Sequence, residues 1–363
     1  MTADLSYQPD RLVSPGAVLA DFLDELDISA RELARRCGRS AKLMVEIIAG
    51  KAPVEPETAL QLERVLGMSA DIWLGLEARY RLELAKTEEI ESMAGATGWA
   101  SRFPLAELRK RGLMGGTGVD GDAVRQLLAF FGCGSVESCK EKFRDLAAVS
   151  YRHSPSFKST EEALLVWLRL GERKAGGIAC ADFDKSVFTK NLKEARALSR
   201  DPIDAALPEL ERLCAAAGVA FCIVKPIEGI RLSGISRWLT PRKALIQQSM
   251  RHMANDHFWF TFFHEAAHLL LHSRKTVFLD SADYRSASDA EEEEANKWAT
   301  NFLVPQTLLE TFIAGFEGTD EEVLDFAERH DVAAGIVVGQ LQNRGVLTYR
   351  QMNHLKVRFK WAA

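Results

Sequence analysis

The sequence predicts a multidomain protein: an all-α bundle at the N-terminus, a helical connecting region, and an α+β domain with a small β-sheet. At 363 residues, the chain is long for a single hydrophobic core. Short capped helical segments fill residues 14–84, whereas apolar runs typical of β-strands lie between 218 and 249. We expect four regions, with the bounds 1–86, 87–160, 161–310 and 311–363.

Composition narrows the class of protein. The net charge of −5 gives no global nucleic-acid footprint, so any DNA contact must come from a local patch. The six cysteines form no C-x-x-C pair and are expected to be reduced thiols. No apolar run reaches the roughly 20 residues of a membrane helix, and the first residues, MTADLSYQPD, lack a secretory pattern. We therefore expect a cytoplasmic protein with no membrane contact.

The N-terminal region is predicted to be a five-helix bundle over 14–84. Ser29 and Glu32 form the S-x-x-E capping box of one short helix, and Ser40 caps the next helix, over 41–49. Helices of this size joined by a tight turn have the helix-turn-helix geometry, in which the second helix enters the DNA major groove.

The local charge favours the same function. Residues 31–51 carry a surplus of four positive charges inside an acidic chain, and phosphate contacts need such a stripe. Short capped helices are nevertheless common, and four charges are a modest surplus, so an ordinary helical bundle remains the alternative at this point.

The segment SPGAVLADFLDEL…SARELARRCGRSAKLMVEIIAGKAPVEPETALQLERVLGMSADIWLGLEARYRL resembles the Xre/Cro-type helix-turn-helix, in particular its HigA-like antitoxin branch. The resemblance implies operator binding as a homodimer. The residues that it would place against bases are Ser40, Ala41, Lys42 and Glu46. Those that it would place against phosphates are Arg35, Arg39 and Lys51. The second helix departs from the family because Ala41, Leu43, Met44 and Val45 offer few bidentate base contacts.

The connecting region is predicted to be mostly helical. Residues 87–98 are polar and contain glycine, which indicates a linker or a loosely packed helix, and 151–160 indicates a second linker. Three short strands follow, over 218–224, 233–239 and 244–249, and a Thr-Pro-Arg-Lys turn joins the last two as a hairpin. We expect the strand 233–239 to hold an extended peptide by main-chain hydrogen bonds.

The most informative motif follows this sheet. His264-Glu265-Ala266-Ala267-His268 is an H-E-x-x-H sequence, in which positions four apart stack on one face of a helix and bring both imidazoles to one metal ion. Glu265 is then placed beside the metal as a general base for the attacking water. Apolar runs flank the motif, and polar groups buried among them need a partner.

Glu292 is the candidate for the third ligand. It lies on the predicted helix 289–305, where Glu292, Ala295, Asn296 and Ala299 share one face. Two histidines and a glutamate form the ligand set of a catalytic zinc site. A run of four glutamates also suits a solvated helix N-terminus, and Glu291, Glu293 and Glu294 are expected at the surface. Residues 311–363 are predicted to be a helical subdomain, with helices over 321–330 and 334–343.

The stretch from about 170 to 310 resembles the ImmA/IrrE metallopeptidase family. The matching segments are GVAFCIVKPIEGIRLSGISRWL, KALIQQSMRHMANDHFWFTFFHEAAHLLLH and EEEEANKWATNFLVP. The resemblance implies a zincin-like domain that binds Zn²⁺ through His264, His268 and Glu292, with Glu265 as general base. It leaves the oxyanion-stabilising residue open among Arg231, Arg237, Tyr284 and Asn296.

Together the two resemblances imply a transcriptional regulator fused to a zinc endopeptidase. Its expected substrate is a repressor or antitoxin-like protein, cleaved in a stress response, or the chain itself within 87–98 or 151–160. The alternative is a non-enzymatic HigA-like antitoxin or repressor, in which the zinc fold serves as a sensor or partner-binding module.

Overall fold

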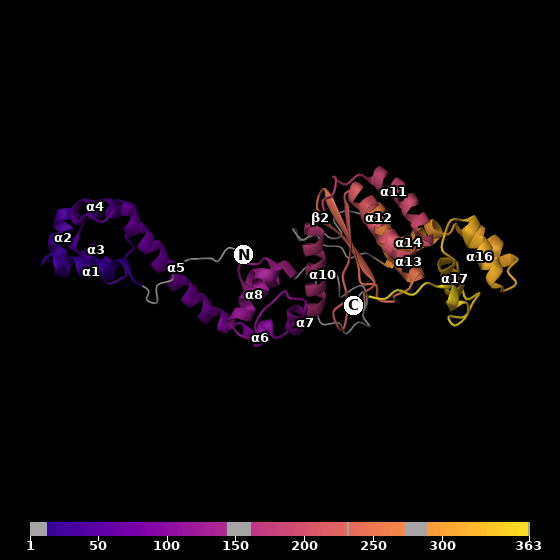
Figure 1. Ribbon diagram of the computed structural model, residues 1–363, viewed down its shortest axis with the longest axis horizontal. Coiled ribbons are helices and arrows are strands. Elements are labelled where there is room, and N and C mark those ends of the chain that lie inside the picture. Colours follow the sequence, from indigo (N-terminus) through magenta and orange to yellow (C-terminus); the bar gives the residue numbers. More distant parts are fainter. Residues whose placement is uncertain (1–12, 144–160, 231, 273–288, 362–363) are drawn as a thin grey trace. The chain divides into compact units, whose positions relative to one another are not determined.

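The computed structural model describes residues 13–143, 161–230, 232–272 and 289–361. Their contacts define two compact units, shown with their helices and strands in Figure 1. The first unit comprises residues up to Gly98 together with Gly118–Arg125, and the second comprises Trp99–Thr117 and everything from Gln126 onward. The multidomain α and α+β organisation predicted from the sequence is confirmed.

The first unit contains the five predicted helices. They are α1 (Pro15–Glu25), α2 (Ala30–Cys37), α3 (Ala41–Ile48), α4 (Pro56–Leu66) and α5 (Ala70–Ala94). The Ser29 and Ser40 side chains accept hydrogen bonds from backbone N–H groups of the helices that they precede. Gly38 ends α2 in the left-handed conformation, with φ of 64°. These caps make α2 and α3 two short helices joined by a tight turn.

A small apolar core holds the bundle together. Leu33 of α2, Met44 of α3 and Trp73 of α5 are all fully buried in it. Gly16 of α1 lies against the end of α3, where a Cβ atom would stand 2.3 Å from the carbonyl oxygen of Ile47. Only glycine therefore permits this close approach of α1 to the end of α3.

The linker expected over 87–98 is largely helical, because α5 continues to Ala94 and α6 (Thr97–Ala100) follows it. Glutamate, methionine and alanine in this stretch are strong helix formers, so a polar composition does not interrupt the helix. The second expected linker, 151–160, lies outside the described residues.

The sheet of the second unit has three strands in the order β1–β3–β2. They are β1 (Val219–Ile223), β2 (Gly234–Thr240) and β3 (Lys243–Gln248). β1 pairs with β3 in parallel, while β2 and β3 form the predicted antiparallel hairpin. β2 is therefore an edge strand within the described part of the chain.

Helices cover both faces of the sheet (Figure 1). α10 (Glu161–Gly176) lies on one face, where the buried Gln247 amide of β3 donates a 2.7 Å hydrogen bond to the Trp167 carbonyl. The other face packs against α12 (Ile203–Ala216) and α13 (Asn255–Leu271), with α11 (Lys185–Ala197) beyond α12. Short helices α7 (Leu105–Lys110) and α8 (Gly121–Phe131), and helical residues 136–143, precede this layer.

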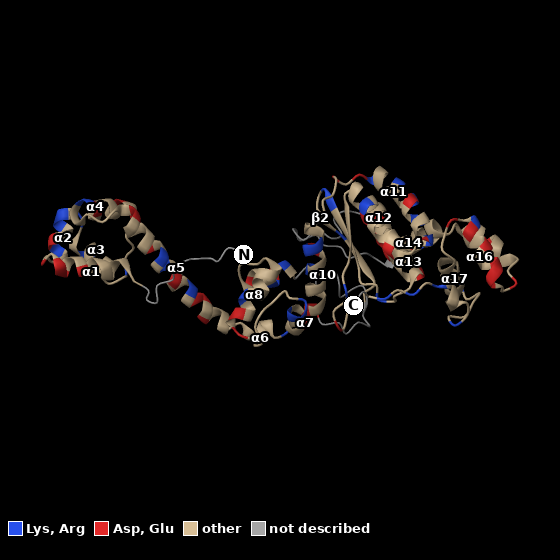
Figure 2. Ribbon diagram, viewed as in Figure 1, with Lys and Arg blue, Asp and Glu red and all other residues tan. Residues whose placement is uncertain are grey.

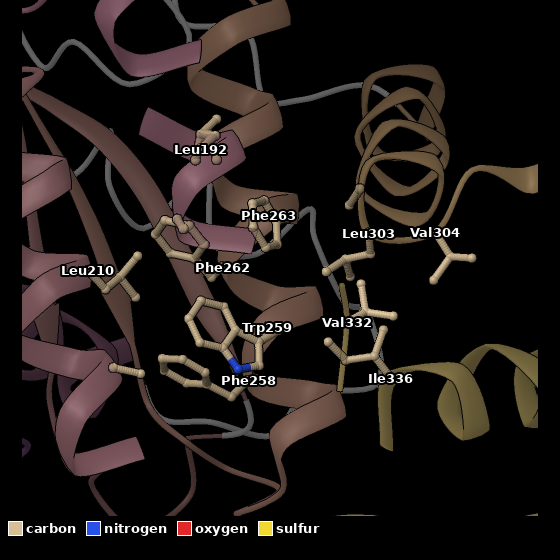
Figure 3. Close-up of a cluster of buried hydrophobic side chains, with 14 of the residues drawn as sticks. Leu192, Leu210, Phe258, Trp259, Phe262, Phe263, Leu303, Val304, Val332 and Ile336 are labelled. Carbon is tan, nitrogen blue, oxygen red and sulfur yellow. The ribbon is translucent and has the colours of Figure 1, made fainter. Parts of the chain in front are cut away.

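α13 is the central helix of the second unit. Its aromatic side chains point into the main apolar core, as Figure 3 shows for Phe258, Trp259, Phe262 and Phe263. The labelled neighbours come from other elements and are Leu192, Leu210, Leu303, Val304, Val332 and Ile336. Each fully buried side chain of this kind contributes about 1.5–3 kcal/mol relative to exposure, so α13 is held firmly.

Four helices complete the second unit: α14 (Asp289–Leu303), α15 (Gln306–Ala314), α16 (Asp320–Arg329) and α17 (Ala334–Asn343). The expectation of a helical C-terminal region is wrong for its last residues, because 356–361 form no helix. Arg358 pairs with Ala254 as an isolated β-bridge, and Val357 exchanges hydrogen bonds with Asn255 at the start of α13. Tertiary hydrogen bonds thus replace the local ones of a helix. No helix among the described residues has the length and apolar character to cross a membrane.

Candidate metal centre and nucleic-acid interface

Two turns of α13 present His264 and His268 on the face opposite its aromatic core residues. Their Nε2 atoms lie 3.1 Å apart, and their side chains are 15% and 16% exposed. The neighbours Phe262, Phe263 and Ala266 are fully buried. The helix thus anchors one face in the core and holds the two imidazoles at the edge of solvent, as the four-residue spacing predicts.

α14 brings Glu292 to the same point. Ala295 and Ala299 of this helix are fully buried, and their small side chains let α14 approach α13 closely. The two carboxylate oxygens of Glu292 lie 3.3 Å from Nε2 of His264 and 3.4 Å from Nε2 of His268. One donor atom from each residue lies within 4.8 Å of the other two.

The electrostatics of this cluster are those of a cation site. Burial lowers the pKa of His264, but the hydrogen bond to Glu292 and the nearby Glu265 charge outweigh it, so the net direction is upward. Burial likewise raises the pKa of Glu292, and the two histidines overcome it and hold the pKa well below its usual range. A carboxylate that attracts positive charge toward two converging imidazole nitrogens fits a divalent metal.

Glu265 lies next to the cluster without joining it. Its side chain is buried at 7% exposure and rests against the start of β2. A Cβ atom on Gly234 would stand only 3.1 Å from its Cγ and 3.2 Å from its Oε1. The edge strand, the buried glutamate and the three donor atoms therefore belong to one small region of the second unit.

Of the residues expected to stabilise the oxyanion, Arg237 and Asn296 are described, and they lie in different surroundings. Arg237 is unsuited to this role because it points to the opposite face of the sheet, where it pairs with Glu172 at 2.6 Å and donates to the Leu168 carbonyl. Asn296 stays near the cluster, where it adds a small upward contribution to the pKa of His264. Arg231 and Tyr284 lie outside the described residues. No local sequence pattern indicates the Arg237 pairing, which depends on how α10 covers the sheet.

The candidate DNA-contacting residues lie around α2 and α3, whose charges are coloured in Figure 2. Ala41, Lys42 and Val45 are exposed on α3, and Glu46 is partly exposed and lies 3.8 Å from the Lys42 ammonium. The Ser40 hydroxyl accepts a hydrogen bond from the Leu43 N–H, so its cap role occupies the group expected to face bases. Lys51 is exposed.

Two of the expected phosphate contacts have protein partners. Arg39 is bound by Gln61 at 2.6 Å and by Glu57 at 2.9 Å. Arg35, at 78% side-chain exposure, pairs with Glu32, and hydrogen bonds from Arg35 and its neighbour Arg36 lower the pKa of Glu32 to about 2. DNA phosphates would therefore compete with carboxylates for these guanidinium groups, which reduces the gain from each contact.

Comparisons with known proteins give a match to one peptidase family and matches to shorter relatives. Residues 249–341 match the IrrE N-terminal-like domain family, peptidase family M78. Over 80 residues the chain is 35% identical to the uncharacterized HTH-type transcriptional regulator YddM of Escherichia coli (strain K12). The matched region covers 22% of this chain and 85% of YddM. It is 30% identical over 78 residues to virulence-associated protein I of Dichelobacter nodosus, covering 21% of this chain and 72% of that protein.

Among solved structures, the chain is similar to an addiction module antidote protein of a HigA family from Coxiella burnetii. The identity is 28%, the TM-score is 0.22, and the match covers 23% of this chain and 91% of that one.

Proposed function

We propose that this chain, which belongs to the HTH-type transcriptional regulators of the Xre/HigA kind and carries a C-terminal IrrE-like M78 peptidase domain, is a DNA-binding regulator with a zinc-dependent endopeptidase activity. The observation that carries the enzymatic part is the convergence of donor atoms from His264, His268 and Glu292 beside the buried Glu265. We further propose that the first unit binds an operator as a homodimer through α3.

The two histidines and Glu292 would hold the metal. Zn²⁺ suits this ligand set and would supply Lewis acidity toward a peptide carbonyl and a nearby water. Glu265 accepts a proton from the attacking water and returns it to the leaving amine as the peptide bond breaks. Its burial against Gly234 limits its side chain to few positions, which favours a general base held ready for proton transfer.

The edge strand β2 supports a peptide substrate in particular. One of its edges pairs with β3, and the other pairs with no strand among the described residues, which suits the addition of an extended chain. Gly234 at its start lies against Glu265, so a peptide added along β2 would pass the general base.

We propose a repressor or antitoxin-like protein as the substrate, recognised in an extended conformation. Self-cleavage near 87–94 would first require the end of α5 to unwind, because these residues are helical. A separate protein substrate therefore meets the geometric need of β2 more directly than this segment of the same chain.

The test compares the full chain with Glu265→Gln and with the control Glu293→Gln, whose parent residue is exposed and paired with Lys297. All three proteins should bind one zinc ion, measured by elemental analysis. Incubated with candidate repressor and antitoxin-like proteins, the parent and the control should release defined fragments by mass spectrometry. Cleavage by Glu265→Gln should be slower by about 10²–10⁴-fold. Zinc binding with equal cleavage by all three would refute the role of Glu265, and the absence of zinc would refute the site.

A second function has one observation in its favour. The match to YddM covers most of that regulator but only 22% of this chain, so a helix-turn-helix unit suffices for a whole regulator. The chain would then act as a repressor or antitoxin whose zinc domain senses metal or binds a partner. A reporter driven by its own promoter discriminates: Lys42→Ala alone should relieve repression under this function, and Glu265→Gln should leave regulation unchanged under every condition tested.

A further inference from the structure

A third histidine continues the cluster on α13. His272 directly follows the helix, and its side chain is only 6% exposed. Its Nδ1 atom lies 2.9 Å from Nδ1 of His268, and its Nε2 atom lies 3.3 Å from Oε2 of Glu294 on α14. Three side chains thus form a continuous chain of hydrogen bonds that leads away from the donor cluster.

The protons in this chain have one consistent arrangement. Nε2 of His268 faces Glu292 and His264, so a metal there requires that nitrogen to be unprotonated and places the proton of the neutral ring on Nδ1. That N–H donates to Nδ1 of His272, which leaves the His272 proton on Nε2. This second N–H donates to the carboxylate of Glu294, which accepts only. Every donor therefore meets an acceptor.

His264 differs in this respect. Its Nδ1 atom is buried and makes no hydrogen bond within the described residues. Both histidines of the motif face Glu292 through Nε2, but among the described residues only His268 has a partner on Nδ1 that selects its tautomer. Partners of this kind raise the basicity of a metal-binding histidine and fix its ring orientation.

We propose that His272 and Glu294 are positioning residues, which hold His268 in the orientation and tautomer that present Nε2 to the metal. The proposal rests on the metal centre proposed above and adds two residues to it. Loss of such partners typically weakens metal binding by about 10–100-fold. The effect should be larger for His272, which contacts His268 directly, than for the 60% exposed Glu294.

The positions of the two ring nitrogens of His272 determine which substitutions test this role. An asparagine amide reaches the position of a histidine Nδ1 atom, and a glutamine amide reaches the position of Nε2. His272→Asn therefore retains a partner for His268, while His272→Gln retains only a group near Glu294. Glu294→Gln weakens the second hydrogen bond, and Glu293→Gln is its control because Glu293 pairs with Lys297 at the surface.

The experiment titrates each full-length protein with zinc chloride against a chromophoric chelator and measures the dissociation constant. We expect the dissociation constant to rise by about 10–100-fold for His272→Gln, by less for His272→Asn and Glu294→Gln, and not at all for Glu293→Gln. Circular dichroism of each metal-free protein verifies that it is folded, and the exposed Glu294 keeps the test valid if a His272 variant unfolds.

The outcomes distinguish failure of the proposed metal centre from failure of the positioning role alone. If the parent chain binds no zinc, or binds it equally well after His264→Ala, the proposed metal centre is wrong and the positioning role falls with it. If the parent binds zinc through His264 but His272→Gln and His272→Asn are equally weakened, or neither is weakened, only the positioning role is overturned.

Discussion

Replacing Lys356 by methionine should destabilise the metal-bearing helix by a predictable amount. The Lys356 ammonium lies 2.6 Å from Oδ2 of Asp256, the second residue of α13, and both side chains are only 8% exposed. Lys356 also donates to the Gln342 side chain at 2.7 Å. The other Asp256 oxygen has no hydrogen-bond partner among the described residues. Methionine keeps the volume of lysine but leaves this carboxylate buried without a counter-charge.

The magnitude follows from two opposing effects. Removing one partner of a buried ion pair costs about 3–5 kcal/mol. The N-terminus of α13 attracts the remaining Asp256 charge and offsets about 1 kcal/mol of this loss. We therefore expect a net destabilisation of about 2–4 kcal/mol, which at about 1.4 kcal/mol per tenfold change is roughly a 30- to 700-fold increase in the open population.

Hydrogen exchange measured by mass spectrometry is the appropriate assay, because a chain with two units does not unfold in a single transition. Slowly exchanging amides of α13 should exchange faster in Lys356→Met by that factor. Lys360→Met is the control, since Lys360 is exposed four residues further along. Adding Asp256→Asn to Lys356→Met should recover at least half of the loss. Exchange within threefold of the parent, or a double variant no more stable than the single one, would refute the argument.

Three further predictions concern the site itself and the DNA-binding unit. Gly234→Ala should lower kcat for peptide cleavage at least tenfold while zinc content stays unchanged, because the new Cβ atom would lie 2.7 Å from Cγ2 of Thr261 and 3.1 Å from Cγ of Glu265, so the Glu265 side chain must move. The metal-free chain should gain the most stability from the His264–Glu292 pair at mildly acidic pH. The contribution of Glu292, whose pKa is lowered, is complete above its ordinary value of 4.5 and is lost as the pH falls toward the lowered value. The contribution of His264, whose pKa is raised, is complete below 6.5 and is lost as the pH rises through the raised value. Melting curves against pH should therefore peak between these values and flatten in Glu292→Gln. Lys42→Ala should weaken operator binding and reduce the slope of log affinity against log salt by about 1, measured by fluorescence anisotropy.

The elements that the sequence predicted well are those set by local rules. The short helices α2 and α3 follow from serine caps and a glycine end, and the hairpin of β2 and β3 follows from two apolar runs around a proline turn. The four-residue spacing of His264 and His268 dictates their shared face whatever surrounds them.

Contacts that depend on the angle between helices and strands could not be predicted from the sequence. Glu294 was expected to be an ordinary surface residue, and only the crossing of α13 and α14 brings it to His272. Arg237 looked available as a catalytic cation until α10 covered it. The pairing of Val357 with Asn255 joins positions about a hundred residues apart, and periodicity along one segment carries no information about such a contact.

The three candidate ligands are fixed to different degrees, and this difference bears on how metal binding is controlled. His264 and His268 share one helix whose other face lies in the main core, so their separation cannot change without disturbing that core. Glu292 belongs to a second helix, and its side chain is 34% exposed, about twice as much as either histidine. It reaches the site only through the close contact that Ala295 and Ala299 allow between α14 and α13. Because a His-His-Glu site needs all three donors, any partner or signal that shifts α14 would alter metal affinity without unfolding the core. The position of α14 is thus the point at which an input to this unit would act on the proposed peptidase centre.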